Sequence, residues 1–279
     1  MAGTLYLVPT PIGNLGDLSD RCRETLAAAD FIAAEDTRVT RKLLSHLDLH
    51  VPMVSYYEHN RIESGERILA RLLAGENCAL VTDAGTPAIS DPGEDLVAKC
   101  AAADVPVVSV PGPCALITAL TVSGQPASRF TFEGFLSTNR KNRSAHLDSL
   151  RGETRTMIFY EAPHKLLDTL ADMAAVFGAE RPVSLCRELT KLHEEVLRTT
   201  FAGALAHYAE QAPRGEYVLV VRGATPEEAP APSVEAAVAD VLARQADGQR
   251  LKDAVREVAE ATGLSRNALY QAALAARDD

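Results

Sequence analysis

Three segments of the chain each run from an aliphatic, β-rich stretch directly into a loop containing glycine and proline. They are LYLVPTPIGN at 5–14, CALVTDAGTPAISDPG at 78–93 and VPVVSVPGPCALITAL at 105–120. In open α/β sheets, ligands bind at loops that follow the carboxyl ends of parallel strands. Glycine there lets the backbone approach a small molecule closely, and proline fixes the path of the backbone. One such loop alone is equally well explained as a turn. Three of them predict a common ligand-binding cleft.

The common motifs for nucleotides and metals are absent from the sequence. No loop reads GxGxxG with an acidic residue downstream, and GxxxxGK[ST] does not occur. The five cysteines are scattered without CxxC spacing, and the seven histidines form no HExxH. We therefore expect a ligand other than a dinucleotide, reduced cysteines and no metal site.

Composition sets the class of protein. A chain of 279 residues with 47% hydrophobic residues can build two domains and a small appendage. It has no run of eighteen apolar residues, so we expect no membrane span. The start, MAGTLYLVPTP, lacks the basic region and long apolar region of a secretory signal peptide, so we expect a cytoplasmic protein. The net charge of −10 disfavours a general nucleic-acid coat protein but allows a local basic groove.

The pattern of elements predicts two α/β domains and a helical tail. Residues 1–122 alternate short apolar strands with helical patterns, which is typical of a largely parallel sheet. A mixed pattern follows the breaker-rich SGQPASRF at 123–130, and a Pro/Ala/Glu tract follows that pattern. The predicted parts are an N-terminal α/β domain (1–123), a second mixed α/β domain (124–223), a linker (224–233) and a C-terminal helical domain (234–279).

The C-terminal part matches a helix-turn-helix pattern. Val255, Val258 and Ala259 share one helix face, Gly263 supplies a turn, and Ser265 can cap the next helix. A plain helical hairpin packed on the rest of the protein explains the same pattern. The tail is therefore predicted either to bind nucleic acid or a partner, or only to pack.

Several ordered motifs resemble one known family. They are VPTPIGNLGDLSDR (8–21), AAEDTRVTRKLL (33–44), SYYEHN (55–60), TDAGTPAISDPG (82–93), SVPGPCALITAL (109–120), FEGFL (132–136), FYEAPHK (159–165), CREL (186–189) and GEYVLVVRG (215–223). Together they resemble the ribosomal RNA small subunit methyltransferase I family of the tetrapyrrole methylase superfamily. The resemblance covers residues 4–223 and extends to the helical tail.

The resemblance implies two α/β domains with S-adenosylmethionine folded in the cleft between them. The implied reaction is methylation of the ribose 2′-oxygen of a cytidine in 16S rRNA, the implied partner is that RNA or the small ribosomal subunit, and the implied state is a homodimer. The first loop departs from the Gly-rich loop of relatives that methylate tetrapyrroles, which argues against a tetrapyrrole substrate. The residues implied to bind the cofactor are Pro9, Thr10, Pro11, Gly13, Asp83, Ala84, Gly85, Thr86, Pro87, Ile89, Pro111, Gly112, Pro113, Cys114, Ala115, Tyr160, Leu185 and Gly215.

Candidate catalytic residues follow predicted strands. A carboxylate of Glu35 or Asp36 could orient the ribose while Arg38 holds a phosphate, although a surface ion pair explains these residues equally well. Glu161, with His164 beside it, could complete the site from the second domain. Because the 2′-hydroxyl is a poor nucleophile, a group that takes its proton would help.

Candidate RNA-binding residues are basic, aromatic or amide side chains. Exposed bases of single-stranded RNA stack on aromatic rings, and phosphates attract cations. We expect the segment 137–143 to be an RNA-contacting loop. The full set of candidates is Arg41, Tyr57, His59, Asn60, Arg140, Lys141, Arg143 and Lys165.

Other functions stay open on sequence grounds. A methyltransferase of the same superfamily that acts on a tetrapyrrole or a protein side chain would share the cofactor loops without needing RNA contacts. A ligand-responsive regulator would use residues 249–276 to bind nucleic acid, although the acidic overall charge weighs against it.

Overall fold

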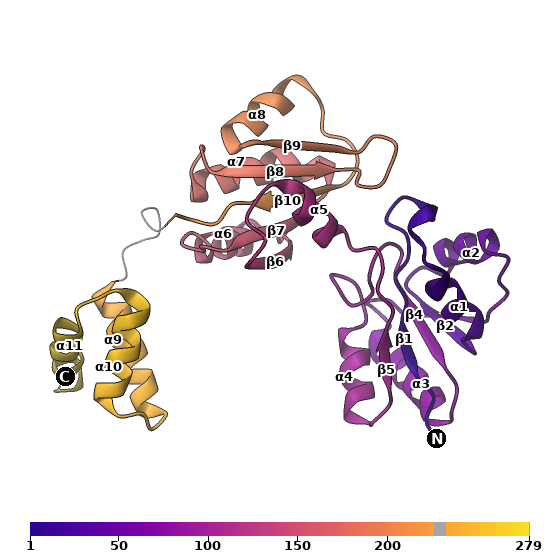
Figure 1. Ribbon diagram of the computed structural model, residues 1–279, viewed down its shortest axis with the longest axis horizontal. Helices are drawn as coiled ribbons and strands as arrows, with labels where there is room; N and C mark the ends of the chain where they lie inside the picture. Colours follow the sequence, from indigo (N-terminus) through magenta and orange to yellow (C-terminus); the bar gives the residue numbers. More distant parts are fainter. Residues whose placement is uncertain (226–232, 279) are drawn as a thin grey trace. The chain divides into compact units, whose positions relative to one another are not determined.

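The apolar runs of the N-terminal part form a parallel five-stranded sheet in the order β3-β2-β4-β1-β5. The computed structural model describes residues 1–225 and 233–278. The strands of this sheet, which lies below the second sheet in Figure 1, are β1 (Leu5–Leu7), β2 (Phe31–Ala34), β3 (Met53–Ser55), β4 (Cys78–Val81) and β5 (Val107–Ser109). Its helices are η1 (Leu15–Asp17), α1 (Asp20–Ala28), α2 (Thr37–His46), α3 (Arg61–Leu73) and α4 (Glu94–Ala102). The parallel sheet predicted for this part is confirmed.

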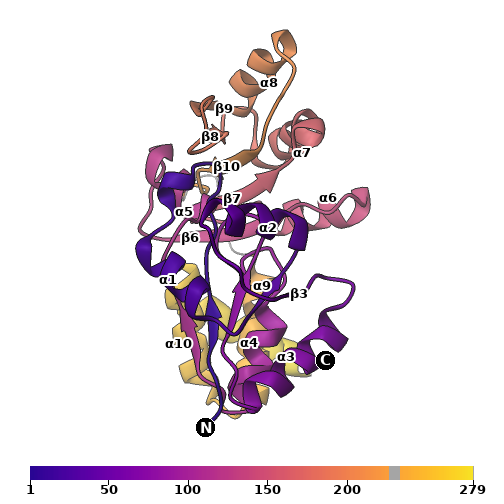
Figure 2. The ribbon, with the colours of Figure 1, turned by 90° about the vertical axis from the view of Figure 1, so that its right-hand side faces the viewer.

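Helices cover both faces of this sheet. Leu26 of α1 and Leu44 of α2 pack on one face with Ile32, and in Figure 2 these two helices lie on the side of the sheet toward the viewer. Leu72 of α3 and Leu96 of α4 pack on the opposite face. The strands are buried on both faces, which explains their continuous apolar sequence.

The second sheet is mixed, with the order β6-β7-β10-β8-β9. Strands β6 and β7 are parallel, whereas β10 is antiparallel to β7 and β8, and β8 is antiparallel to β9. The strands are β6 (Phe130–Phe135), β7 (Thr156–Glu161), β8 (Pro182–Arg187), β9 (Glu195–Thr200) and β10 (Tyr217–Val221). Its helices are α5 (Ala115–Ser123), α6 (Arg140–Ser149), η2 (Pro163–Lys165), α7 (Leu166–Phe177) and α8 (Phe201–Glu210).

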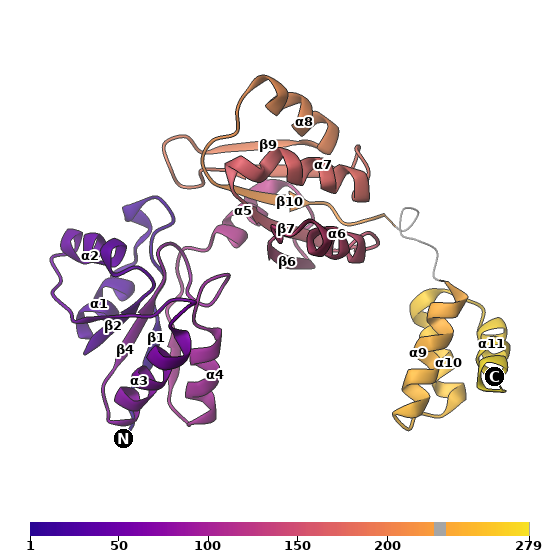
Figure 3. The same cartoon turned by 180° about the vertical axis from the view of Figure 1, so that it is seen from behind.

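Side chains alternate between two cores across the second sheet, as the strand period of two requires. Phe159 and Leu219 face the core formed with α6, α7 and α8, which lie on the near side of the sheet in Figure 3. Ile158 and Val220 face the other core, which α5 covers. The helix at 115–123 therefore packs on the second sheet, although the predicted boundary after residue 123 assigned it to the N-terminal domain. Residues 1–224 together form one compact unit.

Three helices make up a separate compact unit, which begins at residue 225. They are α9 (Val234–Ala246), α10 (Leu251–Thr262) and α11 (Arg266–Asp278). As predicted, Val255, Val258 and Ala259 are buried together, and Gly263 ends α10 in the left-handed conformation with φ of 72°. The Oγ of Ser265 accepts a hydrogen bond from the backbone N of Ala268. Residues 226–232 of the predicted linker lie outside the described residues.

Candidate active site

The three glycine- and proline-containing loops meet, because they follow β4, β1 and β5, which are neighbours in the first sheet. Thr10 and Gly85 exchange two backbone hydrogen bonds of 3.0 Å, which join the first loop to the second. The Oγ1 of Thr86 donates to the carbonyl of Pro113 at 2.8 Å, which joins the second loop to the third. The predicted convergence of the loops is confirmed.

A cavity of about 570 Å³ opens where these loops face the second sheet. A volume of this size is typical of a site for a cofactor or another small molecule. Its walls come from the second and third loops, from the ends of β7, β8 and β10, and from single residues of the first loop and β6. The lining residues are Ile12, Glu35, Asp83, Ala84, Gly85, Thr86, Ile89, Ser90, Asp91, Cys114, Ala115, Phe135, Tyr160, Glu161, Ala162, Pro163, His164, Cys186, Leu189, Lys191, Glu216, Tyr217 and Val218.

The residues predicted to bind a cofactor divide into two groups. Those that line the cavity are Asp83, Ala84, Gly85, Thr86, Ile89, Cys114, Ala115 and Tyr160. Among the others, Thr10 supports the lining from behind, because it is buried and its Oγ1 donates to the carbonyl of Thr82 at 3.1 Å. The residues outside the lining are Pro9, Thr10, Pro11, Gly13, Pro87, Pro111, Gly112, Pro113, Leu185 and Gly215.

Leu185 is not the apolar wall that the sequence suggested. Its side chain is 1% exposed and belongs to the core on the far face of the second sheet. The next residue, Cys186, lines the cavity in its place. The prediction was wrong by one residue because successive side chains of a strand point to opposite faces.

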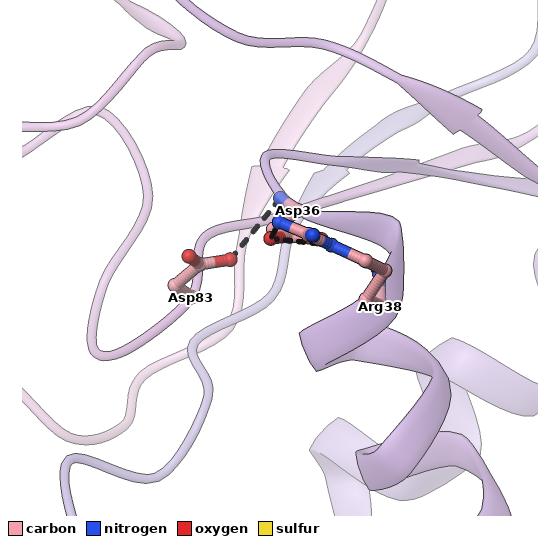
Figure 4. A network of polar contacts seen from close by, with 3 residues as sticks. All are labelled: Asp36, Arg38 and Asp83. Atoms are coloured by element: carbon pink, nitrogen blue, oxygen red, sulfur yellow. Dashed lines mark hydrogen bonds and ion pairs between the residues drawn. The ribbon is translucent and has the colours of Figure 1, made fainter.

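Four acidic residues gather at the ends of β2 and β4. The carboxylate of Glu35 accepts hydrogen bonds from the Oγ1 of Thr82 at 2.6 Å and from the backbone N of Asp83 at 3.2 Å. Asp83 in turn accepts a bond from the backbone N of Asp36 at 3.1 Å, as Figure 4 shows. Asp91 lies in the same wall of the cavity. The first sheet thus presents a negative wall to the cavity.

Burial and mutual repulsion change the acidity of this wall. Burial, together with the charge of Glu35, raises the pKa of Asp91 to about 6. The same two causes raise the pKa of Asp83 above its ordinary value. Removing carboxylates from water and placing them side by side disfavours their charged form. A cationic ligand, or a donor of a proton, would relieve that repulsion.

Asp36 and Arg38 form an ion pair at the start of α2. Asp36 caps the helix by accepting a hydrogen bond from the backbone N of Arg38 at 2.8 Å. Its carboxylate also accepts a hydrogen bond from the Arg38 guanidinium at 2.6 Å (Figure 4). These hydrogen bonds lower the pKa of Asp36 to about 2. Neither residue lines the cavity, and the Arg38 side chain is 84% exposed. Arg38 can therefore reach a ligand outside the cavity, whereas Asp36 serves the helix.

Glu161 lines the cavity but has both carboxylate oxygens occupied. One oxygen accepts from the backbone N of Ala162 at 2.8 Å, and the other accepts from the Oγ1 of Thr169 at 2.6 Å. The residue is 5% exposed. These bonds hold the turn between β7 and α7, so the geometry gives Glu161 a structural task in addition to any catalytic one.

Aromatic side chains form the wall opposite the acidic residues. The hydroxyl of Tyr160 accepts a hydrogen bond from the backbone N of Leu116 at 3.1 Å, and burial raises the pKa of this hydroxyl. Phe135 packs edge-on against Tyr160 with ring centroids 5.4 Å apart. Phe135 is nevertheless 59% exposed, so its ring is available to a ligand at the mouth of the cavity.

Lys191 lies on the second-sheet side of the cavity, close to the first loop. Its Nζ donates to Glu188 at 2.8 Å and to Glu216 at 2.6 Å, and although burial opposes the charged form, these bonds raise its pKa. A Cβ added at Gly13 of the first loop would lie 2.4 Å from the Cγ of Lys191. Glycine at position 13 is therefore required where the first loop meets the second sheet.

The predicted RNA-binding residues lie outside the cavity lining. Arg41 is exposed on α2. Tyr57 and His59 pack edge-on at 6.3 Å, and the Oδ1 of Asn60 accepts from the backbone N of Tyr57 at 2.8 Å, so these residues form one folded turn before α3. Lys165 ends η2, directly after the cavity residue His164.

The segment 137–143 is not the loop that was predicted. Asn139 caps α6, so Arg140, Lys141 and Arg143 belong to its first turn. Arg143 also forms an ion pair of 2.6 Å with Asp172 of α7 and is 16% exposed, which ties the two helices together. Arg140 and Lys141 are exposed and stay candidates for RNA contact. Residues 137–139 do lie before the helix, so the error is confined to the basic residues at 140–143, which belong to the helix and not to the loop.

Several cavity residues were not selected from the sequence. Asp91, Phe135, Cys186, Leu189 and Glu216 all stand inside motifs that carry the family resemblance, and Cys186 and Glu216 directly follow the selected residues Leu185 and Gly215. The alternation of side chains between the two faces of a strand, and the position of the loops, would have identified some of them. Lys191 stands outside every such motif, and only the fold brings it to the cavity.

The described residues also bear on metal sites and membrane-spanning helices. Within residues 1–225 and 233–278, no three His, Cys, Asp or Glu side chains are grouped as metal ligands would be. Over the same ranges, none of the helices is long and apolar enough to span a membrane. The cysteines, among them Cys114 and Cys186 of the cavity, are free thiols.

A family model gives the class of the protein. The model described as tetrapyrrole (corrin/porphyrin) methylases matches residues 4–206, and a second model, described as the RsmI C-terminal HTH domain, matches residues 232–277. The chain therefore belongs to the tetrapyrrole methylase family, and it is a methyltransferase.

Curated relatives define the group within that family. A ribosomal RNA small subunit methyltransferase I from Synechocystis sp. is 51% identical over 272 residues, which is 98% of each chain. The protein of the same name from Escherichia coli O157:H7 is 46% identical over 98% of this chain and 95% of its own. By these identities the chain is a member of the ribosomal RNA small subunit methyltransferase I group.

Solved structures of lower identity share the fold. A diphthine synthase superposes with a TM-score of 0.61 at 14% identity, covering 80% of this chain and 91% of its own. A uroporphyrin-III C-methyltransferase from Thermus thermophilus, complexed with S-adenyl homocysteine, superposes with a TM-score of 0.55 at 16% identity, covering 78% of this chain and 97% of its own. The predicted tetrapyrrole methylase fold is confirmed.

Proposed function

We propose that this chain uses S-adenosylmethionine to methylate the ribose 2′-oxygen of a cytidine in 16S rRNA of the small ribosomal subunit. The observation that carries the proposal is the cavity of about 570 Å³, which is built from the loops that carry the family resemblance. The names of the relatives support the RNA substrate. We expect the protein to work in the cytoplasm as a homodimer, and the exposed Ile117 and Phe130 are candidates for apolar contact between its copies.

The cavity residues fit S-adenosylmethionine. Ile12, Ile89 and Leu189 offer apolar walls to an adenine ring, and the backbone of the second loop offers hydrogen-bonding groups beside them. The acidic wall suits a ligand that carries a positive charge, because such a ligand relieves the repulsion that raises the pKa values of Asp83 and Asp91. When bound, this cofactor supplies a methyl group attached to a positively charged sulfur.

The chain's own residues contribute position and proton transfer. An in-line displacement needs the acceptor oxygen close to the methyl carbon and aligned with it, so most of the acceleration comes from holding the two reactants in place. The O–C bond forms while the S–C bond breaks, and the hydroxyl proton passes to a base. We infer that Asp91 takes that proton, because it lines the cavity and its pKa of about 6 leaves it mainly ionised at neutral pH.

Residues around the cavity supply contacts for the RNA. Phe135 can stack on an unpaired base at the mouth, since specific readers of RNA stack unpaired bases on aromatic rings. Arg38 can exchange its exposed contact with Asp36 for a phosphate. Arg41, Tyr57, His59, Asn60 and Lys165 lie on elements of the same unit and complete the proposed RNA surface.

The decisive experiment supplies labelled S-adenosylmethionine and unmodified small ribosomal subunits, then identifies the methylated nucleoside by digestion and mass spectrometry. We expect 2′-O-methylcytidine. A labelled base, another ribose or a labelled ribosomal protein would overturn the assignment. Cofactor binding without labelled RNA would favour a tetrapyrrole or protein side-chain acceptor, which the family and the fold also accommodate.

A further inference from the structure

A second cleft lies on the opposite face of the second sheet, where the side chain of Tyr217 belongs to the core that α6, α7 and α8 cover. Its volume is about 310 Å³, and it is formed where the end of β8 and the starts of β9 and β10 meet the last turn of α8. Tyr217 lines both spaces, and the preceding Glu216 lines only the cavity. The residues that line this side cleft are Arg187, Glu195, His207, Tyr208, Gln211, Ala212, Arg214 and Tyr217.

Hydrogen-bond donors outnumber acids in the side cleft. Arg187 donates from Nε to the carboxylate of Glu195 at 2.9 Å, which fixes the guanidinium and leaves its terminal N–H groups facing no ion-pair partner among the described residues. Arg214 is exposed, and the described part of the chain shows no side-chain partner for it. His207 and Gln211 add further polar groups. Arginine N–H groups in this arrangement match the oxygens of a phosphate.

The backbone holds Arg214 at this place. Its N–H donates to the hydroxyl of Tyr217 at 3.2 Å, and the ring of Tyr217 packs edge-on against Tyr208 at 5.9 Å. Gly215 follows in the left-handed region with φ of 79°, where a Cβ would lie 2.5 Å from the side chain of Glu188. The turn that carries Arg214 is therefore fixed between the side cleft and the cavity.

We propose that the side cleft binds a phosphate group of the RNA strand whose nucleotide the cavity holds. The inference rests on the proposed function, because it takes RNA as the substrate. The turn at 214–217 joins the two spaces at the end of the sheet, because Glu216 and Tyr217 line the cavity while Arg214 and Tyr217 line the side cleft. A strand that leaves the cavity over this turn can place a phosphate against Arg214 and Arg187. A free phosphate ion offers the same chemistry, and the experiment separates these two sources.

The test compares Arg214→Gln with Arg129→Gln. Arg129 precedes β6, at the opposite edge of the second sheet, so its loss controls for a lower positive charge. Equilibrium binding to unmodified small subunits is measured over a series of salt concentrations, and S-adenosylmethionine binding is measured by calorimetry. We expect Arg214→Gln to weaken subunit binding about tenfold and to reduce the slope of log affinity against log salt by roughly one unit, with cofactor affinity unchanged.

Three results would overturn the inference. The first is unchanged subunit affinity and an unchanged salt slope in Arg214→Gln. The second is an equal loss of subunit affinity in Arg129→Gln. The third is inhibition of methyl transfer by inorganic phosphate that depends on Arg214 while subunit affinity stays unchanged, which would assign the cleft to a free anion. Binding is measured without turnover. A wild-type protein that binds subunits but transfers no methyl group would therefore contradict the proposed reaction. The binding comparison would still test the side cleft in that case.

Discussion

Gly112 of the third loop lies directly against Pro9 of the first loop. A Cβ built at residue 112 would be 2.3 Å from the Cγ of Pro9, a distance that real side chains do not adopt. The contact joins β1 and β5 just beyond their carboxyl ends, where the backbone begins to enclose the cavity. The proline ring is rigid, so an added methyl group must displace one of the two loops.

Gly112→Ala should disturb the cavity more than the fold. We expect cofactor affinity to fall at least about tenfold, since a displacement of about 1 Å in a binding loop breaks its hydrogen bonds. Gly65→Ala is the matched control, because Gly65 lies in α3, where alanine is favoured, and a Cβ there would meet only the Nζ of Lys99 at 3.5 Å and the ring of Tyr56 at 3.7 Å. Calorimetric titration of both variants gives the result. Wild-type affinity in Gly112→Ala would show that the loops can separate without harm.

Asp91→Asn should stabilise the protein at high pH. The folded state raises the pKa of Asp91 from 3.8 to about 6, so the native protein binds this proton more tightly than the unfolded chain does. The wild type therefore loses stability as the pH rises from 4 to 6, and the neutral amide removes that loss. Urea unfolding should show a gain on the order of 1 to 3 kcal/mol at pH 8 and little change at pH 4. An equal effect at both pH values would contradict the assignment.

Loss of the hydrogen bond between Glu161 and Thr169 should account for much of the stability that is lost when Glu161 is mutated. Thr169→Val removes the 2.6 Å bond and leaves one buried carboxylate oxygen without it, which should cost about 1 to 3 kcal/mol of unfolding free energy. Glu161→Gln keeps an oxygen that can accept from Thr169. If Glu161→Gln retains stability but lowers turnover, the charge acts in catalysis. If turnover follows stability in both variants, Glu161 has only its structural task.

Phe135→Leu should affect the RNA and not the cofactor. The ring is 59% exposed at the mouth of the cavity, so its loss opens no large void in a core. Stacking on a base is worth about 1 to 3 kcal/mol, and we expect KM for small subunits to rise about tenfold while cofactor affinity is unchanged. Phe135→Tyr keeps an aromatic face and should restore KM. Equal activity of the Leu and Tyr variants would exclude stacking.

The sequence predicted the sheets and the meeting of the loops because both follow from local pattern. Apolar runs such as 78–81 define buried strands, and the glycine and proline after them define where the backbone turns. Which face of the sheet a given strand side chain points to is harder to predict, because it changes with every residue. The prediction named Leu185 for the cavity wall, whereas the neighbouring Cys186 lines it. Lys191 could not be found in this way, because its place depends on Gly13, Glu188 and Glu216 meeting in the folded chain.

The position of α5 also required the three-dimensional structure. Its sequence reads as the helix that follows a parallel strand, and such a helix commonly returns to its own sheet. Leu116 and Leu120 instead pack against Ile158 and Val218 of the second sheet. Only a comparison of the two apolar surfaces, which local pattern does not provide, indicates which sheet the helix covers.

This crossing gives the third loop a mechanical role. Pro111–Pro113 belongs to the first covalent connection between the two sheets, and the same segment leads into the cavity residues Cys114 and Ala115. Any opening of one sheet from the other must bend this segment, and a ligand that seals the cavity must stiffen it. Any separation of the sheets that releases a bound molecule must therefore bend this segment, and its two prolines restrict how far the backbone can turn there.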